Sequence, residues 1–375
     1  MRILLISTYW PEYSGPAVRM RELNEFFNED VVIFCPLRVR RGFKFEVHKN
    51  SKYKEYIFSL RTFYIFDFII GFIVSLFLPC NKLIHVLGSS PFSHSLFLLT
   101  NFRKDLKILF ELVCDDSSPL IKYSKLPFKI KPNKKSILIL PLTSSQNFKG
   151  FKFIIKPNPI SEKVFQFSKK KLKKNKIKIK GSEIYLGYLS KFKIFKNQLF
   201  LINVLKDLPE NYKLILRGPI QQDYFLKGIN NEEYLDMIKQ RVIDLNLSSR
   251  VDIKTGFEDP INFFKKIDFY VNPSLREGFG TTVIEAIACG LPVVANKDIK
   301  AFKDCEKICK KTFYLEGVDN SKRFAEKIMD LSENVSLENL EASRLMIINN
   351  YSQKRIIDIY KKAYQILKNN NKLIN

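Results

Sequence analysis

The sequence predicts an α/β protein of two domains, each a parallel sheet covered by helices. The chain has 375 residues, which is long for a single hydrophobic core. Hydrophobic residues make up 46% of it, enough to fill a packed interior. In each half of the chain, short apolar runs alternate with helix-compatible segments, a pattern typical of βαβ units and parallel sheets.

The first half begins with an apolar run at Arg2–Ser7, which predicts a buried strand. A turn-rich loop containing Ser14-Gly15-Pro16 and a helix-compatible segment lead to a second apolar run at Val31–Cys35. Since the loop lacks the spacing G-x-G-x-x-G, it does not support a dinucleotide-binding fingerprint. Further strands of this half are predicted at Lys82–Gly88, Lys107–Val113, Ser136–Leu140 and Lys152–Pro157.

The proline-containing stretch "KPNPIS" predicts a junction between two domains, at residues 1–157 and 158–351. After it, strands and helices alternate again. Strands of the second half are predicted at Glu183–Ser190, Tyr212–Gly218, Arg250–Gly256, 268–274 and 292–296. Two Rossmann-like domains with a cleft between them are the simplest architecture, and in such sheets ligands bind beyond the carboxyl ends of the strands.

The net charge of the chain restricts its partners. Lys and Arg number 63 against 38 Asp and Glu, which gives +25 and predicts an anionic partner. Nucleic acid, an acidic membrane surface and a phosphorylated substrate all fit this charge. No RNA-recognition or helix-turn-helix signature is present, so nucleic-acid binding is the least favoured of the three.

Cysteine usage and the start of the chain indicate the compartment. The six cysteines are scattered, without the dense pairing of a small secreted scaffold. The opening "MRILLISTYW" has no small-residue cleavage pattern, so it is interpreted as a strand and not as a signal peptide. We therefore expect a reducing, cytoplasmic location.

An apolar segment at Phe63–Cys80 approaches the length of a membrane span, about 20 residues. Asp67 lies inside it, and Gly71 and Pro79 interrupt it. We interpret it as a buried or interfacial helix in preference to a transmembrane one. An interfacial helix in a basic chain predicts peripheral association with the inner face of the membrane.

Two glutamates bracket a glycine turn in "NPSLREGFGTTVIEAIACGLPVVAN". Glu285 fits the Thr-x-x-Glu capping box of a helix that is expected to begin at Thr282, whereas Glu277 lies in the preceding loop. The backbone N–H groups of Gly280, Thr281 and Thr282 are expected to face a phosphate. The carboxylates cannot bind phosphate, but they can accept hydrogen bonds from sugar hydroxyls. This pattern predicts a nucleotide-sugar site.

The stretch "REGFGTTVIEAIACGLPVVA", with seven residues between its glutamates, resembles the signature of the family 4 retaining glycosyltransferases of GT-B fold. The resemblance is strongest from Ile184 to Ala295 and includes "LGYLSKFKIFKNQ", which resembles the donor-phosphate loop. "IKPNPIS" is similar to the hinge of that fold. "YSQKRIIDIYKKAYQIL" is similar to its final helix, so residues 352–375 are expected to pack back on the first domain.

The resemblance implies a role for individual residues. It makes the first domain acceptor-binding and the second nucleotide-sugar-binding. Glu277 would hold hydroxyls of the donor sugar, and Lys196 would neutralise the departing diphosphate. Glu285 would hold the ribose. Further donor contacts are implied at Gly278, Phe279, Gly280, Thr281, Thr282, Ser190, Ser14, Gly15, Gly256 and Ile253, the last two near the nucleobase.

The sequence departs from the family pattern at several positions. Tyr188 stands where an arginine is usual, and Lys196 is farther from the preceding glycine than usual, so Lys193 or Lys191 are alternatives for the phosphate contact. Leu87 aligns with a histidine that touches the donor sugar in many members, and His85 is interpreted as a packed strand residue. Possible acceptor or auxiliary contacts are Arg19, Asp115 and Asp116, the two aspartates having a loop cap as their alternative role.

The resemblance implies a retaining, metal-independent hexosyl- or glycosyltransferase that uses a nucleoside-diphosphate sugar as co-substrate and no other cofactor. No D-x-D sequence is present, which argues against a phosphate-binding metal clamp. The acceptor is expected to be lipid-linked or a polysaccharide, in surface polysaccharide (lipopolysaccharide or capsule) biosynthesis. A catalytically weakened partner subunit is the main alternative, and a nucleic-acid-binding protein is the weaker one.

Overall fold

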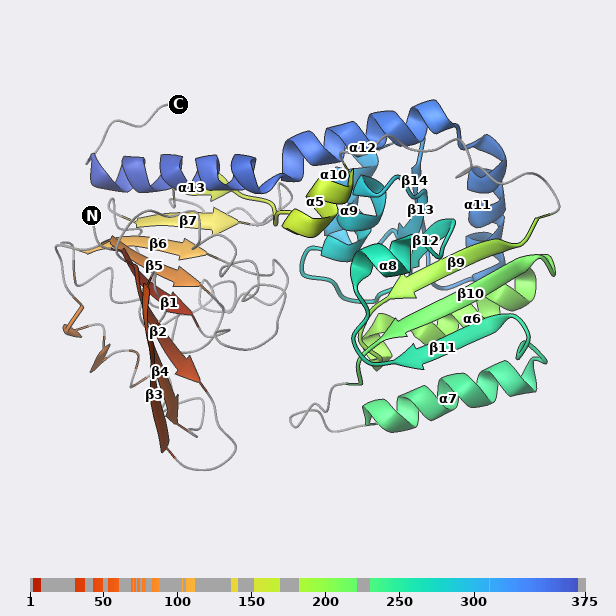
Figure 1. Cartoon of the computed structure of the whole chain (residues 1–375), viewed down its shortest axis with the longest axis horizontal. Helices are drawn as coiled ribbons and strands as arrows, with labels where there is room; N and C mark the ends of the chain where they lie inside the picture. Colours follow the sequence, from red (N-terminus) through yellow and green to blue (C-terminus); the bar gives the residue numbers. More distant parts are fainter. Residues whose placement is uncertain are drawn as a thin grey trace, which may run out of the picture. The chain divides into compact units, whose positions relative to one another are not determined.

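The structure is a computed structural model, and the chain divides into two compact units. Unit 1 comprises Met1–Pro159 and Gln353–Asn375, and unit 2 comprises Ile160–Ser352 (Figure 1). The structure describes residues 3–7, 31–37, 43–49, 53–60, 83–87, 106–111, 136–140, 152–168, 182–220, 230–309 and 311–369, together with residue 103 and most positions of 69–78.

Unit 1 contains an eight-stranded sheet in the order β3-β4-β2-β1-β5-β6-β7-β8. Only the edge strand β3 is antiparallel to its neighbour; the other pairs of this sheet are parallel. The strands are β1 (Ile3–Ser7), β2 (Val31–Leu37), β3 (Phe43–Lys49), β4 (Tyr53–Leu60), β5 (Leu83–Leu87), β6 (Lys107–Glu111), β7 (Ser136–Leu140) and β8 (Phe153–Ile155).

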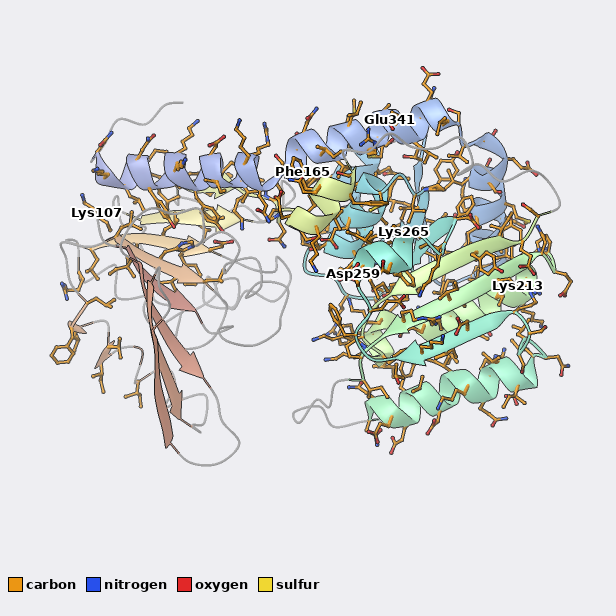
Figure 2. The ribbon with its side chains drawn as sticks, viewed as in Figure 1. Lys107, Phe165, Lys213, Asp259, Lys265 and Glu341 are labelled. Atoms are coloured by element: carbon orange, nitrogen blue, oxygen red, sulfur yellow. The ribbon has the colours of Figure 1, made fainter. Side chains whose placement is uncertain are left out.

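Helix α13 (Gln353–Lys368) covers the β5–β7 part of this sheet. Its buried residues recur at helical spacing and form one apolar stripe: Ile356, Ile357, Tyr360, Ala363 and Leu367. The stripe packs on Leu83, Leu87, Leu109, Ile137 and Ile139. At the far end of the helix, Lys107 Nζ donates to the carbonyl oxygen of Lys368 at 3.3 Å (Figure 2).

A buried polar cluster lies between the sheet and α13. Glu111 forms an ion pair with Lys156, accepts from Tyr360 Oη at 2.6 Å and lies 3.0 Å from His85 Nε2. Tyr364 Oη is 2.9 Å from His85 Nδ1. Burial raises the pKa of Glu111, but the charge of Lys156 and the bond and charge of His85 outweigh it and lower that pKa to about 2. His85 is therefore a packed strand residue, as expected.

Unit 2 contains a six-stranded parallel sheet in the order β11-β10-β9-β12-β13-β14. Its strands are β9 (Ile184–Leu189), β10 (Tyr212–Gly218), β11 (Val251–Thr255), β12 (Phe269–Asn272), β13 (Val293–Asn296) and β14 (Phe313–Glu316). The chain moves outward from β9 to β11, then returns to the other side of β9 with β12. The strand order therefore reverses between β9 and β12, the place where open α/β sheets bind ligands.

Helices connect and cover these strands (Figure 1). They are α5 (Glu162–Ser168), α6 (Gln198–Asp207), α7 (Asn231–Asp244), α8 (Pro260–Phe264), α9 (Thr281–Ala288), α10 (Lys300–Ile308), α11 (Ser321–Asn334) and α12 (Leu337–Tyr351). Side-chain caps fix several starts. Asn230 and Glu233 form a capping box on α7, and Asp259 caps α8, whose first residue is Pro260.

The apolar segment near residue 70 presents one exposed face. Ile69, Ile73, Leu76 and Phe77 are exposed, Phe77 by 81%, whereas Leu78 is buried. Arg103 donates to the carbonyl oxygens of Leu76 and Leu78 at 2.8 and 3.2 Å, and so caps the end of this helical turn. In the part of the chain that the structure describes, none of the helices combines the length and apolar character needed to cross a membrane.

Candidate active site

The loop that follows β12 is fixed at the switch point of the unit 2 sheet. Ser274 is fully buried, and its backbone N–H donates to Asn272 Oδ1 at 3.0 Å. Asn296, at the end of the neighbouring strand β13, donates from Nδ2 to the carbonyl oxygen of Ser274 at 2.9 Å. The carboxyl ends of the two strands thereby hold the loop in one conformation.

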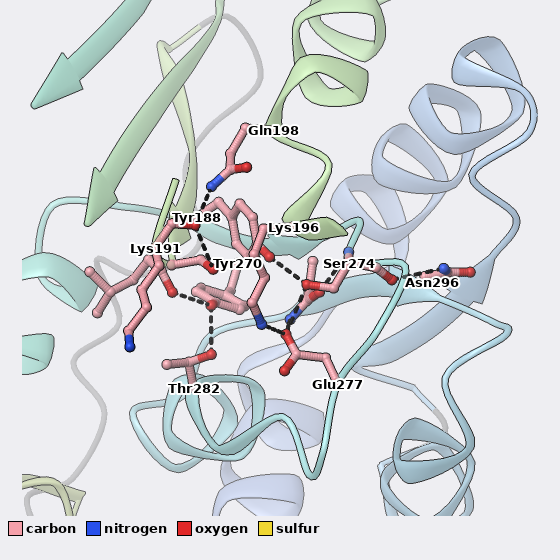
Figure 3. A network of polar contacts seen from close by, with 12 residues as sticks. Tyr188, Lys191, Lys196, Gln198, Tyr270, Ser274, Glu277, Thr282 and Asn296 are labelled. Carbon is pink, nitrogen blue, oxygen red and sulfur yellow. Dashed lines mark hydrogen bonds and ion pairs between the residues drawn. The ribbon is translucent and has the colours of Figure 1, made fainter. Parts of the chain in front are cut away.

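Glu277 and Lys196 meet at this loop (Figure 3). Lys196 Nζ lies 2.6 Å from Glu277 Oε1, and the two side chains are 16% and 12% exposed. Ser274 Oγ donates to the same oxygen at 2.8 Å, and Asn272 Nδ2 lies 3.5 Å from it. Among the residues that the structure describes, every hydrogen bond that Glu277 receives ends on Oε1. Oε2 is thus left as an acceptor for a ligand.

A short 3-10 helix, η2 (Ile194–Lys196), places Lys196 beside the glutamate. Asn197 adopts a left-handed conformation, with φ 57°, and links η2 to α6. The ammonium groups of Lys193 and Lys196 lie 5.7 and 5.6 Å from the ring centroid of Phe195. The η2 turn therefore brings Lys196 to the carboxylate.

Helix α9 begins at Thr281, with Gly280 as its N-cap residue and no side-chain capping bond. The expected capping box is therefore wrong. Gly280 has φ 70°, and a Cβ there would lie 2.3 Å from the Phe302 ring, so only glycine fits. Thr282 Oγ1 instead accepts from Tyr270 Oη at 2.9 Å.

Glu285 is 6% exposed and accepts from the backbone N–H of Ser161 at 3.1 Å, just before α5. It thus connects α9 to the start of unit 2. Phe279 is also buried, with its ring centroid 6.0 Å from that of Tyr351. The Phe279 side chain therefore packs inside unit 2.

The residues expected near a nucleobase lie at the end of β11. Ile253 is half-buried, and Gly256, with φ 106°, is exposed and donates to the carbonyl oxygen of Gly218 at 3.1 Å. Ser190, at the end of β9, donates its N–H to the carbonyl oxygen of Arg217 at 2.9 Å. Arg217 is buried and forms ion pairs with Asp252 and Glu258.

Tyr188 is 1% exposed and points into unit 2, with its Oη 2.5 Å from Ser274 Oγ. Burial, and then the charge of Glu277, raise the pKa of the Tyr188 phenol well above its ordinary value.

Glu277 and Lys196 were predicted from the sequence as site residues, and the structure brings them together. The supporting side chains Asn272, Ser274 and Asn296 were not predicted. Of the predicted site residues, Ser14, Gly15, Arg19, Asp115 and Asp116 lie outside the described residues.

The sequence of this chain is similar to those of known glycosyltransferases. Residues 169–355 match the family model of Glycosyl transferases group 1. A region of 212 residues, 55% of this chain, is 25% identical to the capsular polysaccharide biosynthesis glycosyltransferase CapM of Staphylococcus aureus and spans 52% of it. A region of 100 residues, 26% of this chain, is 32% identical to the N-acetylgalactosamine-N,N'-diacetylbacillosaminyl-diphospho-undecaprenol 4-alpha-N-acetylgalactosaminyltransferase of Campylobacter jejuni and spans 24% of it. The chain thus spans about half or less of these relatives' length.

Among solved structures, the sucrose-phosphate synthase of Thermosynechococcus elongatus superposes with a TM-score of 0.72, at 16% identity, over 98% of this chain and 99% of that one. At this identity the likeness shows the fold alone. The expected fold class is confirmed: a GT-B protein with two parallel-sheet α/β domains. More particularly, the match to the glycosyl transferases group 1 lies almost wholly within unit 2.

Proposed function

We propose that this protein is a family 4 retaining glycosyltransferase that moves a sugar from a nucleoside-diphosphate sugar to a lipid-linked or polysaccharide acceptor in surface polysaccharide biosynthesis. The observation that carries the proposal is the Lys196–Glu277 pair at the switch point of a glycosyl transferases group 1 domain. The relatives named for capsular polysaccharide and for a diphospho-undecaprenol-linked sugar support the acceptor class.

The proposed reaction breaks the bond between the anomeric carbon and the diphosphate oxygen and forms a bond from that carbon to the acceptor hydroxyl oxygen, whose proton passes to the departing diphosphate. Negative charge grows on the departing diphosphate, and Lys196 supplies a positive charge beside it, so the proposal requires no metal ion. Glu277 Oε2 accepts hydrogen bonds from the donor sugar. Tyr188 cannot replace the usual arginine as a phosphate ligand because its hydroxyl points inward to Ser274. We assign no enzyme nucleophile.

The other donor contacts are proposed around this pair. The amides of Gly278, Phe279 and Gly280 would face the sugar or diphosphate. Glu285 would bind the ribose, since a carboxylate offers about four acceptor sites. The remaining proposed donor contacts are Thr281, Thr282, Ser190, Ile253 and Gly256 in unit 2 and Ser14 and Gly15 in unit 1. Arg19, Asp115 and Asp116 are proposed as acceptor or auxiliary contacts.

Calorimetric titration of a panel of UDP- and GDP-sugars into the purified chain tests this function. One donor is expected to bind, and Glu277→Gln is expected to weaken its binding about 10- to 100-fold, because a charge-assisted hydrogen bond contributes about 1.5–3 kcal/mol. Glu232→Gln, an exposed position on the first turn of α7, is the matched control. Unchanged donor affinity and transfer in Glu277→Gln would show that the assignment is wrong.

The same titration separates the second candidate function. A catalytically weakened partner subunit is favoured by one observation, the buried Tyr188 at the position of a phosphate-binding arginine. Such a subunit would bind the donor selectively but release no nucleoside diphosphate until a partner protein is added. Turnover by the purified chain alone would exclude it.

We also propose that unit 1 docks on an anionic membrane surface from the cytoplasmic side. The exposed face formed by Ile69, Ile73, Leu76 and Phe77 supports this proposal, and so does the net charge of +25.

Replacing Ile73 and Phe77 together by aspartate is expected to weaken binding to vesicles containing phosphatidylglycerol about a hundredfold. Each side chain contributes about 1.5 kcal/mol or more on burial. Sedimentation with vesicles measures the loss, and Ile243→Asp, an exposed apolar position of α7, is the control. Equal binding by the double variant and the wild type would reject membrane docking through this face.

A further inference from the structure

Tyr188 lies inside the candidate site without facing a ligand. It stands on β9, next to the switch point, and its ring is packed edge-on against Tyr270 with the ring centroids 6.2 Å apart. Its hydroxyl reaches Ser274 Oγ at 2.5 Å (Figure 3). The residue is therefore anchored on a central strand, and its hydroxyl contacts Ser190 as well as Ser274 in the Glu277 loop.

The direction of the hydrogen bonds follows from the available protons. The Glu277 carboxylate can only accept, so the single hydroxyl proton of Ser274 is donated to Glu277 Oε1, at 2.8 Å. Ser274 Oγ then has only lone pairs to offer Tyr188, and Tyr188 must donate. Burial keeps the pKa of its phenol well above the ordinary value, so this proton is retained. The result is a chain of donors from Tyr188 through Ser274 to Glu277.

Ser274, the middle residue of this hydrogen-bond series, is held in place. Ser274 is held through its own backbone by Asn272 and Asn296, and it is fully buried. Hydrogen bonds arranged in series polarise one another, so the bond to the carboxylate is strengthened by the phenol behind it. Ser274 and Lys196 both donate to Glu277 Oε1, which leaves Oε2 to accept hydrogen bonds from a ligand.

We propose that Tyr188 is a positioning residue for the donor sugar: by donating to Ser274 it fixes the orientation of the Glu277 carboxylate. The inference rests on the proposed function, in which Glu277 holds sugar hydroxyls. Tyr188 thereby supports recognition of the sugar. The phosphate contact that an arginine usually makes in the family is instead made by Lys196 on η2 or by Lys193 just before it. The Tyr188 hydroxyl is therefore expected to contribute to binding of the sugar part of the donor and not to binding of its nucleoside diphosphate part.

Two ligands separate positioning from general structure: the nucleotide sugar that the wild type selects from the UDP and GDP panel, and the matching nucleoside diphosphate. Tyr188→Phe is expected to weaken binding of the nucleotide sugar about tenfold and to change that of the nucleoside diphosphate less than twofold. Ser274→Ala is expected to have the same effect, and the double variant no larger one, because the two groups act in series. Tyr212→Phe, a buried tyrosine at the amino end of β10, is the matched control and is expected to change neither affinity.

The possible outcomes distinguish the positioning role of Tyr188 from the proposed role of Glu277 in holding the donor sugar. Equal losses for the two ligands in Tyr188→Phe would indicate a structural role and overturn the inference, as would wild-type affinity for the nucleotide sugar. If Glu277→Gln weakens sugar binding while Tyr188→Phe does not, only the role of Tyr188 is rejected. If Glu277→Gln has no effect, or no donor binds the wild type, the proposed function is rejected with it.

Discussion

Lys156→Met is expected to destabilise unit 1 by about 3–5 kcal/mol, since it leaves the buried Glu111 carboxylate without its cation. Lys156 is 3% exposed and Glu111 4%, so water cannot take over the lost partner. Lys156 Nζ also donates to Tyr360 Oη on α13 at 2.9 Å, and the substitution therefore weakens the attachment of this helix to the sheet. Urea unfolding, with hydrogen exchange of the α13 amides, measures the effect.

The pH dependence of stability identifies the interaction that is lost. The folded-state pKa of Glu111 is about 2, below its ordinary value near 4.3, so its stabilising contribution is present above about pH 4.3 and is lost as the pH falls toward 2. Lys156→Met is expected to reduce this acid-dependent loss, since the hydrogen bond and charge of His85 remain. The double variant Glu111→Gln, Lys156→Met should regain part of the stability, because it removes the unpaired charge. A single variant as stable as the wild type would contradict the ion-pair assignment.

Strong apolar runs allowed most of the fold to be predicted from the sequence. The strands β5 to β7, β9, β10 and β12 are such runs, and each lies within a predicted range, as does the more exposed β11. The pair β3–β4 was missed because its sequences, FKFEVHK and YKEYIFSL, mix charges with apolar residues, as suits strands toward the edge of a sheet. The strand β14, FYLE, was missed because it is short and only its first residue is buried.

The candidate site was predictable only where local spacing carries the information. Glu277 was found from its place beside a glycine turn, and Lys196 from a resemblance in the loop before α6. The partners Ser274 and Tyr188 are 86 positions apart in the sequence, so no local pattern connects them. The start of α9 was misplaced for a similar reason: the left-handed Gly280 is required by the Phe302 ring, which lies beyond the next strand.

Lys196→Met is expected to lower the rate of sugar transfer about 10²- to 10³-fold. Removal of one preorganised group that stabilises charge in the transition state has this size of effect. Lys196 forms an ion pair with Glu277 at 2.6 Å, and it lies on a short helix that is anchored through Asn197 Nδ2, 3.3 Å from the carbonyl oxygen of Pro273. The substitution removes a positive charge that is held in a fixed position beside Glu277, and an exposed lysine elsewhere cannot supply a charge at that position. Steady-state transfer with the donor selected by calorimetry measures the rate.

Two further lysines make the comparison specific. Lys265 also lies over a phenylalanine ring, 5.3 Å from the centroid of Phe167, and Lys265→Met should transfer sugar at the wild-type rate. Lys193 shares the Phe195 ring with Lys196, and it is the Lys196 ammonium group that donates to Glu277. Lys193→Met is therefore expected to cost less than tenfold. A larger loss in Lys193→Met than in Lys196→Met would move the contact with the leaving group to Lys193, and Lys196 would then serve only to orient Glu277.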